Sequence, residues 1–254
     1  MEKLIRKRAL AGLDSYGLNV AIHDASIIEM AAYAGYDFVR VDCEHMLFDN
    51  ATLSEMIRTA KLLEIPLQLR VTNLAQASAF LDCGATALMI PHVRSRDIAL
   101  EAVAALKYAP LGERGMTTSA RVLRFGQQKL SEYARRANDE VDLIIQIEDR
   151  DGLHNIDEIL SVDGVDFVAT GRNDLAQALG VPGENTHPDV LEAENMVIRK
   201  AIEHKKIPTL LVKNRKRIQE LRERGVHCFS IARDDLLLYS SLKSQLDQMQ
   251  AVQE

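Results

Sequence analysis

Eight short, nearly continuous apolar segments recur along this chain of 254 residues, and amphipathic stretches lie between them. Segments rich in Val, Ile and Leu without polar alternation are typical of parallel strands that are buried on both faces. The pattern therefore predicts eight parallel strands, at residues 18–22, 38–41, 66–71, 87–91, 143–147, 167–170, 209–212 and 228–231.

The intervening stretches carry apolar residues at helical spacing, as at residues 50–63, 95–107, 127–138 and 188–204. A glycine precedes a strand by about three residues at Gly35, Gly84, Gly164 and Gly225, where we expect a helix to end with positive φ. The alternation has no Pro- or Ser-rich linker, and the length suits one barrel. We therefore predict an α/β fold, a single-domain (β/α)8 TIM barrel spanning residues 1–254.

The composition excludes several classes of protein. A net charge of -6 gives no general attraction to nucleic acid, and the basic clusters at residues 6–8 and 213–217 are interpreted as solvated surface. Cys43, Cys83 and Cys228 form neither a disulfide framework nor a zinc motif. No apolar run is long enough to cross a membrane, no signal peptide is recognisable, and no dinucleotide or Walker motif follows a strand. We expect a cytoplasmic protein that binds neither nucleic acid nor membrane.

Polar residues directly after the predicted strands are the best candidates for chemistry, because (β/α)8 enzymes place their active sites there. They are Asp42, Glu44, His45, Arg70, His92, Gln146, Glu148, Arg172, Asn173 and Asp174. Glu148 and Asp174 are suited to a hard divalent cation and leave ligand positions open for a substrate. The alternative is an ion-paired or capping pair, since Asp174 precedes an apolar helical run.

Arg70 is the only charge in its predicted strand, so we expect an anion beside it. It is suited to stabilising an enolate oxygen, or else it pairs with Asp42 or Glu44. His45 can transfer a proton near neutral pH, although a structural role is equally compatible with its position. The other histidines show no ligand spacing and are interpreted as structural or surface residues, at positions 23, 92, 154, 187, 204 and 227.

Residues 108–126 form a long polar segment after the fourth predicted strand and its helix. Loops of this length in compact domains commonly serve a site. Two interpretations remain open: a mobile element over the barrel mouth, or a static loop that contacts another subunit.

Several blocks of the sequence resemble the HpcH/HpaI aldolases, which are class II pyruvate-dependent aldolases acting on 4-hydroxy-2-oxo acids. The blocks follow one another in order from about residue 15 to residue 235. They are AGYDFVRVDCEH from Ala34, PLQLRV from Pro66, LDCGATALMIPHV from Leu81, ALKYAPLGERGM from Ala105, LIIQIEDRDGLHNIDEIL from Leu143 and VDGVDFVATGRNDLAQALG from Val162.

The resemblance implies a barrel of the phosphoenolpyruvate/pyruvate superfamily type, a Mg²⁺, Mn²⁺ or Co²⁺ cofactor, and a hexamer built as a trimer of dimers. Glu148 and Asp174 match the metal carboxylates of the family, and Arg70 matches the arginine on the pyruvate keto or enolate oxygen. Gln146 matches a glutamine beside that site, and backbone amides near Asn173 and Asp174 would hold the substrate carboxylate.

Three further residues acquire roles from the resemblance. His45 matches the acid-base histidine that acts through a metal-bound water. Asp82, otherwise a turn residue, matches the partner that orients this histidine, contributed from a neighbouring subunit. Asp42 matches a residue hydrogen-bonded to the waters of the metal.

The chain departs from the family pattern at two motifs. The usual Gly-Pro-Ala-Asp-Leu-Ser is Gly-Arg-Asn-Asp-Leu-Ala from Gly171, and the usual Asp-Gly-Glu-His is Asp-Cys-Glu-His from Asp42. Arg172, together with Arg114, Arg121 and Arg124, favours a substrate with several carboxylates, unless Arg172 pairs with a local acid.

The function expected from these residues is a metal-dependent, reversible aldol cleavage of a 4-hydroxy-2-oxo acid to pyruvate and an aldehyde. The alternative on the same scaffold is a citrate-synthase-like condensation of acetyl-CoA with oxaloacetate in a siderophore pathway. A non-catalytic binding barrel is the third hypothesis, and the complete set of polar strand-end residues speaks against it.

Overall fold

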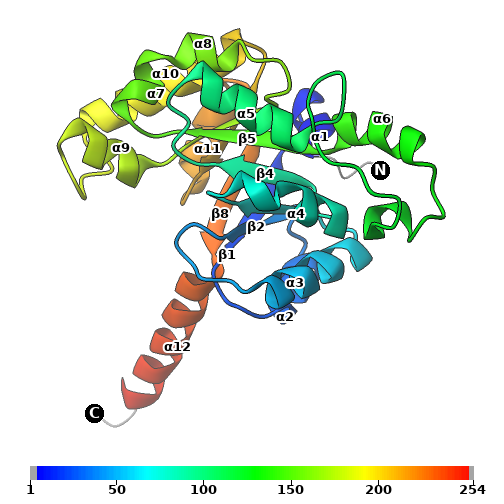
Figure 1. Ribbon diagram of the computed structural model, residues 1–254. Helices are drawn as coiled ribbons and strands as arrows, with labels where there is room; N and C mark the ends of the chain where they lie inside the picture. Colours follow the sequence, from blue (N-terminus) through cyan, green and yellow to red (C-terminus); the bar gives the residue numbers. More distant parts are fainter. Residues whose placement is uncertain (1–4, 252–254) are drawn as a thin grey trace.

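A computed structural model describes residues 5–251, in which eight parallel strands close into a barrel in sequence order (Figure 1). All eight predicted strands are present, so the predicted (β/α)8 architecture is confirmed. The strands are β1 (Ser15–Val20), β2 (Phe38–Asp42), β3 (Leu67–Arg70), β4 (Ala87–Ile90), β5 (Asp142–Ile147), β6 (Phe167–Thr170), β7 (Ile207–Leu211) and β8 (Cys228–Arg233). The domain prediction covers residues 1–254, of which 1–4 and 252–254 lie outside the described residues, and it stays a prediction.

Helices surround the barrel and connect its strands (Figure 1). They are α1 (Ile5–Leu10), α2 (Ser26–Tyr33), α3 (Asn50–Leu62), α4 (Ala77–Cys83), α5 (Arg96–Leu106), α6 (Leu130–Glu140), α7 (Arg150–His154), α8 (Ile156–Leu160), α9 (Arg172–Leu179), α10 (Pro188–Glu203), α11 (Arg215–Arg222) and α12 (Asp234–Gln250), with 3-10 turns η1 (Leu74–Gln76) and η2 (Arg121–Leu123). No helix among residues 5–251 has the length and apolar content needed to cross a bilayer.

Local sequence explains most helix boundaries. The side chains of Asp49 and Ser95 accept hydrogen bonds from the first free amides of α3 and α5, as N-caps do. The four glycines predicted to end helices all have positive φ, from 83° to 123°. The start of β1 was missed, because Ser15, Tyr16 and Gly17 do not form an apolar run although they pair with β8.

The barrel interior changes character from one end to the other. Near the amino ends of the strands it is apolar, and Ile5 of α1 closes it against Phe38, Phe167 and Cys228. A Cβ at position 17 would overlap the Phe38 ring, so only glycine leaves room for this packing. Above this layer the side chains that point inward become polar, which places hydrogen-bonding groups toward the carboxyl ends.

A compact group of charges closes the amino end of the barrel. Lys107 is fully buried, and its Nζ lies 2.9 Å from Asp166 Oδ2 and donates to the carbonyl of Val141 at 2.6 Å. Arg6 of α1 pairs with both Asp142 and Asp166. The chain therefore neutralises its own buried carboxylates at this end.

The segment 108–126 does not lie over the barrel mouth, so that interpretation is wrong. It follows α5, and a connection after a helix of a β/α unit lies at the amino end of the strands, opposite the mouth. Tyr108 and Leu123 are buried in the main core, and Arg114 pairs with Asp82 at 2.5 Å. The alternative, a static loop that contacts another subunit, is compatible with this position.

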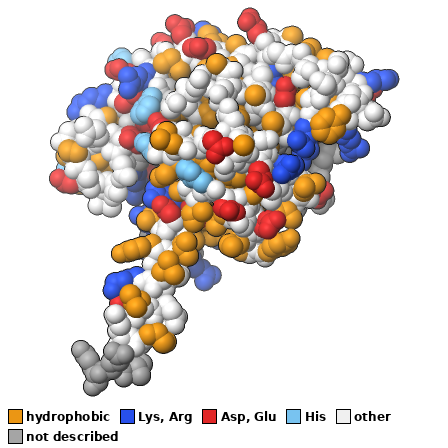
Figure 2. Space-filling view, turned by 60° about the horizontal axis from the view of Figure 1, so that its bottom comes forward, with side chains coloured by type: hydrophobic (Ala, Val, Ile, Leu, Met, Phe, Trp, Pro, Cys, Tyr) orange, Lys and Arg blue, Asp and Glu red, His pale blue; other side chains and the backbone are white. Residues whose placement is uncertain are grey.

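Helix α12 leaves the barrel at the end of β8 and extends away from it (Figure 1). Its base is fixed by Asp234, which is buried and accepts hydrogen bonds from the amides of Ala21 and Ile22. Further along, several of its apolar residues are more than half exposed, including Leu238, Leu242 and Leu246. Figure 2 shows these hydrophobic side chains along the helix and over the neighbouring part of the body.

Candidate functional site

A cavity of about 560 Å³ opens at the carboxyl ends of the strands, within the usual range for a small-molecule site. It is lined by seven of the ten strand-end candidates: Asp42, His45, Arg70, Gln146, Arg172, Asn173 and Asp174. The parallel register brings these residues together, because each follows or ends a strand of the same closed barrel.

Asp42 and Arg70 form a forked ion pair across neighbouring strands. They are register partners in β2 and β3, and Arg70 donates Nε to Asp42 Oδ1 at 2.9 Å and Nη2 to Oδ2 at 2.6 Å. Burial alone would raise the pKa of Asp42, but the hydrogen bonds and charge of Arg70 hold that pKa below its ordinary value. The anion expected beside Arg70 is therefore present within the chain, and the arginine still faces the cavity.

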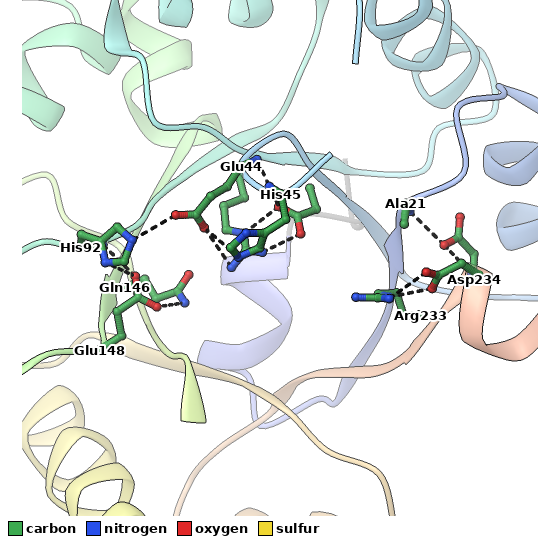
Figure 3. Close-up of polar contacts among 11 residues, drawn as sticks. Ala21, Glu44, His45, His92, Gln146, Glu148, Arg233 and Asp234 are labelled. Atoms are coloured by element: carbon green, nitrogen blue, oxygen red, sulfur yellow. Dashed lines mark hydrogen bonds and ion pairs between the residues drawn. The ribbon is translucent and has the colours of Figure 1, made fainter. Parts of the chain in front are cut away.

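Glu44 links Arg70 to the two histidines at the mouth (Figure 3). Its Oε2 lies 3.2 Å from Arg70 Nη1 and 3.6 Å from His45 Nε2, and its Oε1 lies 3.1 Å from His92 Nε2. The His45 side chain is 57% exposed, so solvent and substrate both reach it. This position suits the predicted proton transfer, which stays a prediction.

Glu148 and Asp174 converge beside Gly171. A Cβ at Gly171 would lie 2.6 Å from Glu148 Oε2, 2.7 Å from Gln146 Nε2 and 2.8 Å from Asp174 Oδ2. Both carboxylate oxygens are thus close to one point, and only a glycine leaves that point free. Burial first, and then the nearby Asp174 and Glu44, raise the pKa of Glu148 to about 7.

Two buried or half-buried carboxylates of this kind suit a hard divalent cation. Such an ion would offset the repulsion between them, and two protein ligands leave room for substrate oxygens. Within the described part of the chain, no group of three or more His, Cys, Asp or Glu side chains is arranged to hold an ion. The two carboxylates beside Gly171 are the pair predicted from the sequence, and their binding of a metal stays a prediction.

His92 contacts Glu148 directly, although from the sequence we interpreted it as a structural or surface residue. Its backbone N–H donates to Glu148 Oε1 at 2.9 Å, and its Nδ1 lies 3.1 Å from the same oxygen (Figure 3). It adopts φ 54°, a left-handed conformation that is uncommon for residues other than glycine. Such strain concentrates at functional sites. The sequence signal was its place after β4, which we discounted because His92 lacked ligand spacing.

Gln146 and Asn173 complete the polar lining on the β5 and β6 side. Gln146 donates Nε2 to Glu148, whereas its buried Oε1 has no hydrogen-bond partner in the structure. An unpaired buried oxygen is costly, so it calls for a donor from a ligand or water. Asn173 and Asp174 lie in the first turn of α9, where free backbone amides attract an anion.

Asp82 is the one predicted catalytic residue that does not reach the cavity. It lies near the end of α4, at the amino end of the barrel, and pairs with Arg114. The role implied by the resemblance therefore requires a second subunit.

Arg172 lines the cavity but is held by the local acid Glu194, at 2.5 and 2.8 Å. The predicted alternative for Arg172, pairing with a local acid, is therefore present, and its contact with substrate stays a prediction. Arg114 pairs with Asp82 and does not line the cavity. Arg121 and Arg124 lie in or beside η2, away from the cavity.

Comparison with known proteins gives one consistent result. A model of the family described as HpcH/HpaI aldolase/citrate lyase matches residues 15–240. A hydroxypyruvate/pyruvate aldolase of Sagittula stellata is 39% identical over 185 residues, covering 72% of each chain. A 4-hydroxy-2-oxo-heptane-1,7-dioate aldolase of Escherichia coli is 31% identical over 243 residues, covering 94% of this chain and 91% of the relative.

Solved structures of similar proteins include two kinds of enzyme. The citrate synthase SbnG superposes with a TM-score of 0.91 at 29% identity, over 99% of this chain and 100% of its own. An HpcH/HpaI aldolase from Desulfitobacterium hafniense gives 0.90 at 28% identity, over 97% and 96% of the two chains.

Proposed function

Since the chain belongs to the HpcH/HpaI aldolase/citrate lyase family, we propose that it is a carbon-carbon lyase of the aldolase type. Its reaction is the reversible cleavage of a 4-hydroxy-2-oxo acid to pyruvate and an aldehyde. The observation that carries this proposal is the convergence of Glu148 and Asp174 on one point beside Gly171. Gly171, Asp174 and Arg70 all line the cavity.

A divalent cation, Mg²⁺, Mn²⁺ or Co²⁺, belongs to this proposal, with Glu148 and Asp174 as its protein ligands. When bound, it supplies Lewis acidity toward the 2-keto oxygen. Gln146 lies against Glu148, and its unpaired Oε1 can accept a hydrogen bond from a substrate or water. The backbone amides at Asn173 and Asp174 hold the substrate carboxylate.

Arg70, Asp42 and His45 have separate roles in the proposed reaction. Arg70 donates to the 2-keto oxygen and stabilises the negative charge that develops there as the C3–C4 bond breaks. Asp42 holds the guanidinium in place through its forked contact. His45, exposed at the mouth, removes the proton of the 4-hydroxyl group, and the electrons of that O–H bond form the aldehyde carbonyl. The electrons of the C3–C4 bond form the pyruvate enolate, which takes up a proton from water at C3 to give pyruvate.

A homo-oligomer also belongs to the proposal, a hexamer arranged as a trimer of dimers. Asp82 can orient His45 only from another subunit. Helix α12 offers an apolar stripe with Leu238 and Leu242, and α2 exposes Met30 and Tyr33. Replacing Leu238 and Leu242 by Glu should produce smaller particles in light scattering, whereas a hexamer of unchanged mass would contradict the role of α12.

A condensation of acetyl-CoA with oxaloacetate is the second candidate, because SbnG, a citrate synthase, superposes so closely. Release of coenzyme A from these two substrates, without cleavage of hydroxy-oxo acids, would favour it over the aldolase.

The test is pyruvate release from a panel of 4-hydroxy-2-oxo acids, before and after EDTA treatment. We expect EDTA to abolish the activity and Mg²⁺, Mn²⁺ or Co²⁺ to restore it. Full activity of the EDTA-treated protein contradicts the metal-dependent mechanism, and an inactive metal-loaded protein across the panel contradicts the aldolase.

A further inference from the structure

Arg40 lies in the middle of β2, inside the barrel, and is only 9% exposed. Its guanidinium donates Nε and Nη2 to Gln68 Oε1 at 3.0 and 2.8 Å. Nη2 also donates to Thr209 Oγ1 at 3.2 Å, and Nη1 donates to Ser230 Oγ at 3.1 Å. All of these partners are neutral.

No carboxylate among residues 5–251 forms an ion pair with Arg40. The nearest strand-end acid is Asp42, two residues along β2, and both of its oxygens are already engaged by Arg70. Burial lowers the pKa of Arg40 to about 10, because the charged form is less stable inside the barrel than in water. Neutral acceptors offset only part of the cost of burying a cation.

The guanidinium forms part of the floor of the cavity. Arg40, Met89, Ala169 and Thr209 all line it, so the cavity reaches below the Asp42–Arg70 pair. A step of two residues along a strand places Arg40 about 6 to 7 Å deeper than Asp42. Small side chains such as Ala169 leave space above it.

One donor of Arg40 remains free. A guanidinium carries five N–H bonds, and four of them are used by Gln68, Thr209 and Ser230. The remaining N–H belongs to Nη1.

We propose that Arg40 binds a second anionic oxygen group of the substrate at the floor of the cavity. The preferred substrate is then a dicarboxylate, with one carboxylate on the 2-oxo acid end and another reaching down to Arg40. This inference rests on the proposed function for the placement of the 2-oxo acid end. The second carboxylate can belong to the 2-oxo acid half or to the aldehyde half.

Two pairs of compounds, each matched in shape, show which half of the substrate carries the carboxylate that binds Arg40. For the 2-oxo acid half, oxaloacetate is compared with 4-methyl-2-oxopentanoate, in which an isopropyl group replaces the carboxylate. For the aldehyde half, succinic semialdehyde is compared with 4-methylpentanal. Binding to the Mg²⁺-loaded protein is measured by calorimetry with freshly prepared oxaloacetate, and the aldehydes are added in the presence of saturating pyruvate.

We expect the wild-type protein to bind the anionic member of one pair about 10- to 100-fold more tightly, as a charge-assisted hydrogen bond implies. Arg40→Leu should lose this preference while still binding pyruvate. Arg40→Lys, which keeps the charge without the fork, should retain part of it. Ser230→Ala is the matched control, because it removes a neutral partner of Arg40 and leaves the charge.

The outcomes separate the two proposals. Equal binding within both pairs by the wild-type protein, or an unchanged preference in Arg40→Leu, overturns the role of Arg40. Should Arg40→Leu fail to fold, a reduced preference in Arg40→Lys together with the full preference in Ser230→Ala supports the inference, and an unchanged preference in Arg40→Lys overturns it. A clear preference for one anionic member together with no aldol cleavage contradicts the proposed function and leaves the anion site standing.

Discussion

Each end of the barrel holds a buried carboxylate whose pKa is raised to about 7, Asp142 at the amino end and Glu148 at the carboxyl end. Burial is the main cause in both, and a second carboxylate adds to it, Asp166 in one case and Asp174 in the other. The surroundings differ. At the amino end, Arg6 and Lys107 neutralise the pair and α1 covers it.

At the carboxyl end, Glu148 and Asp174 have no Lys or Arg partner among the ion pairs of residues 5–251. Glu148 contacts His92 instead, and Asp174 lines an open cavity. A pair of acids satisfied by the chain is part of the fold. A pair that the chain leaves without a cation is suited to an ion from solution. The comparison therefore separates a structural cluster from a candidate site although the pKa values are the same.

The largest effect is expected at the carboxyl end. Glu148→Gln and Asp174→Asn should each lower kcat/KM for aldol cleavage by at least about 1000-fold, because metal assistance contributes several kcal/mol. Asp142→Asn, the matched change at the amino end, should leave kcat/KM within about two-fold. Comparable losses in all three variants would break the distinction between the two ends.

Arg70→Lys should lower kcat by about 100-fold, because a lysine cannot keep the forked contact with Asp42 and also donate to the developing oxyanion. Binding of Mn²⁺, followed by electron paramagnetic resonance, should be unchanged, since Arg70 is not a ligand. A weakened Mn²⁺ affinity equal to that of Asp174→Asn would assign Arg70 to the metal site instead.

His92 is expected to position Glu148 through its backbone N–H and its ring. His92→Gly keeps the left-handed backbone and removes the ring, and it should weaken Mn²⁺ binding about 10-fold, as outer contacts of metal ligands do. Asn also tolerates positive φ and retains a donor, so His92→Asn should fall between glycine and the wild type. Identical Mn²⁺ dissociation constants for all three proteins would leave the ring without a role.

The smallest effect concerns stability and pH. An acid whose pKa rises on folding favours the folded state below its ordinary pKa, and this advantage is lost as the pH increases to about 7. The Tm of Asp142→Asn should therefore rise relative to that of the wild type by about 7 to 14 °C between pH 4.5 and pH 8. Scanning calorimetry at several pH values measures this, and parallel curves would contradict the raised pKa.

Much of the fold was predictable because parallel strands buried on both faces leave an apolar signature that needs no alignment. The prediction failed where a strand lacks that signature, as at Ser15 and Gly17 in β1. One of the two interpretations of the segment 108–126 failed for a different reason: its length suggested an element over the mouth, yet its position after a helix assigns it to the amino end of the barrel.

Predicting the site was more difficult, because its geometry depends on residues distant in sequence. The position after a strand identified Glu148, Asp174 and Arg70. The same position also indicated His92. Its contact with Glu148 could not be predicted, because the two residues lie 56 positions apart in the sequence and His92 has a positive φ. Arg40 was visible as a charge inside an apolar run, but only the closed barrel reveals that its partners are neutral.

Helix α12 contributes little burial to its own barrel beyond Asp234. On the proposed assembly, part of the free energy of folding is then gained only when copies meet, so dilution and unfolding become linked equilibria. The Tm would then increase with protein concentration. An enzyme that gains stability through such an assembly is least stable at low protein concentration.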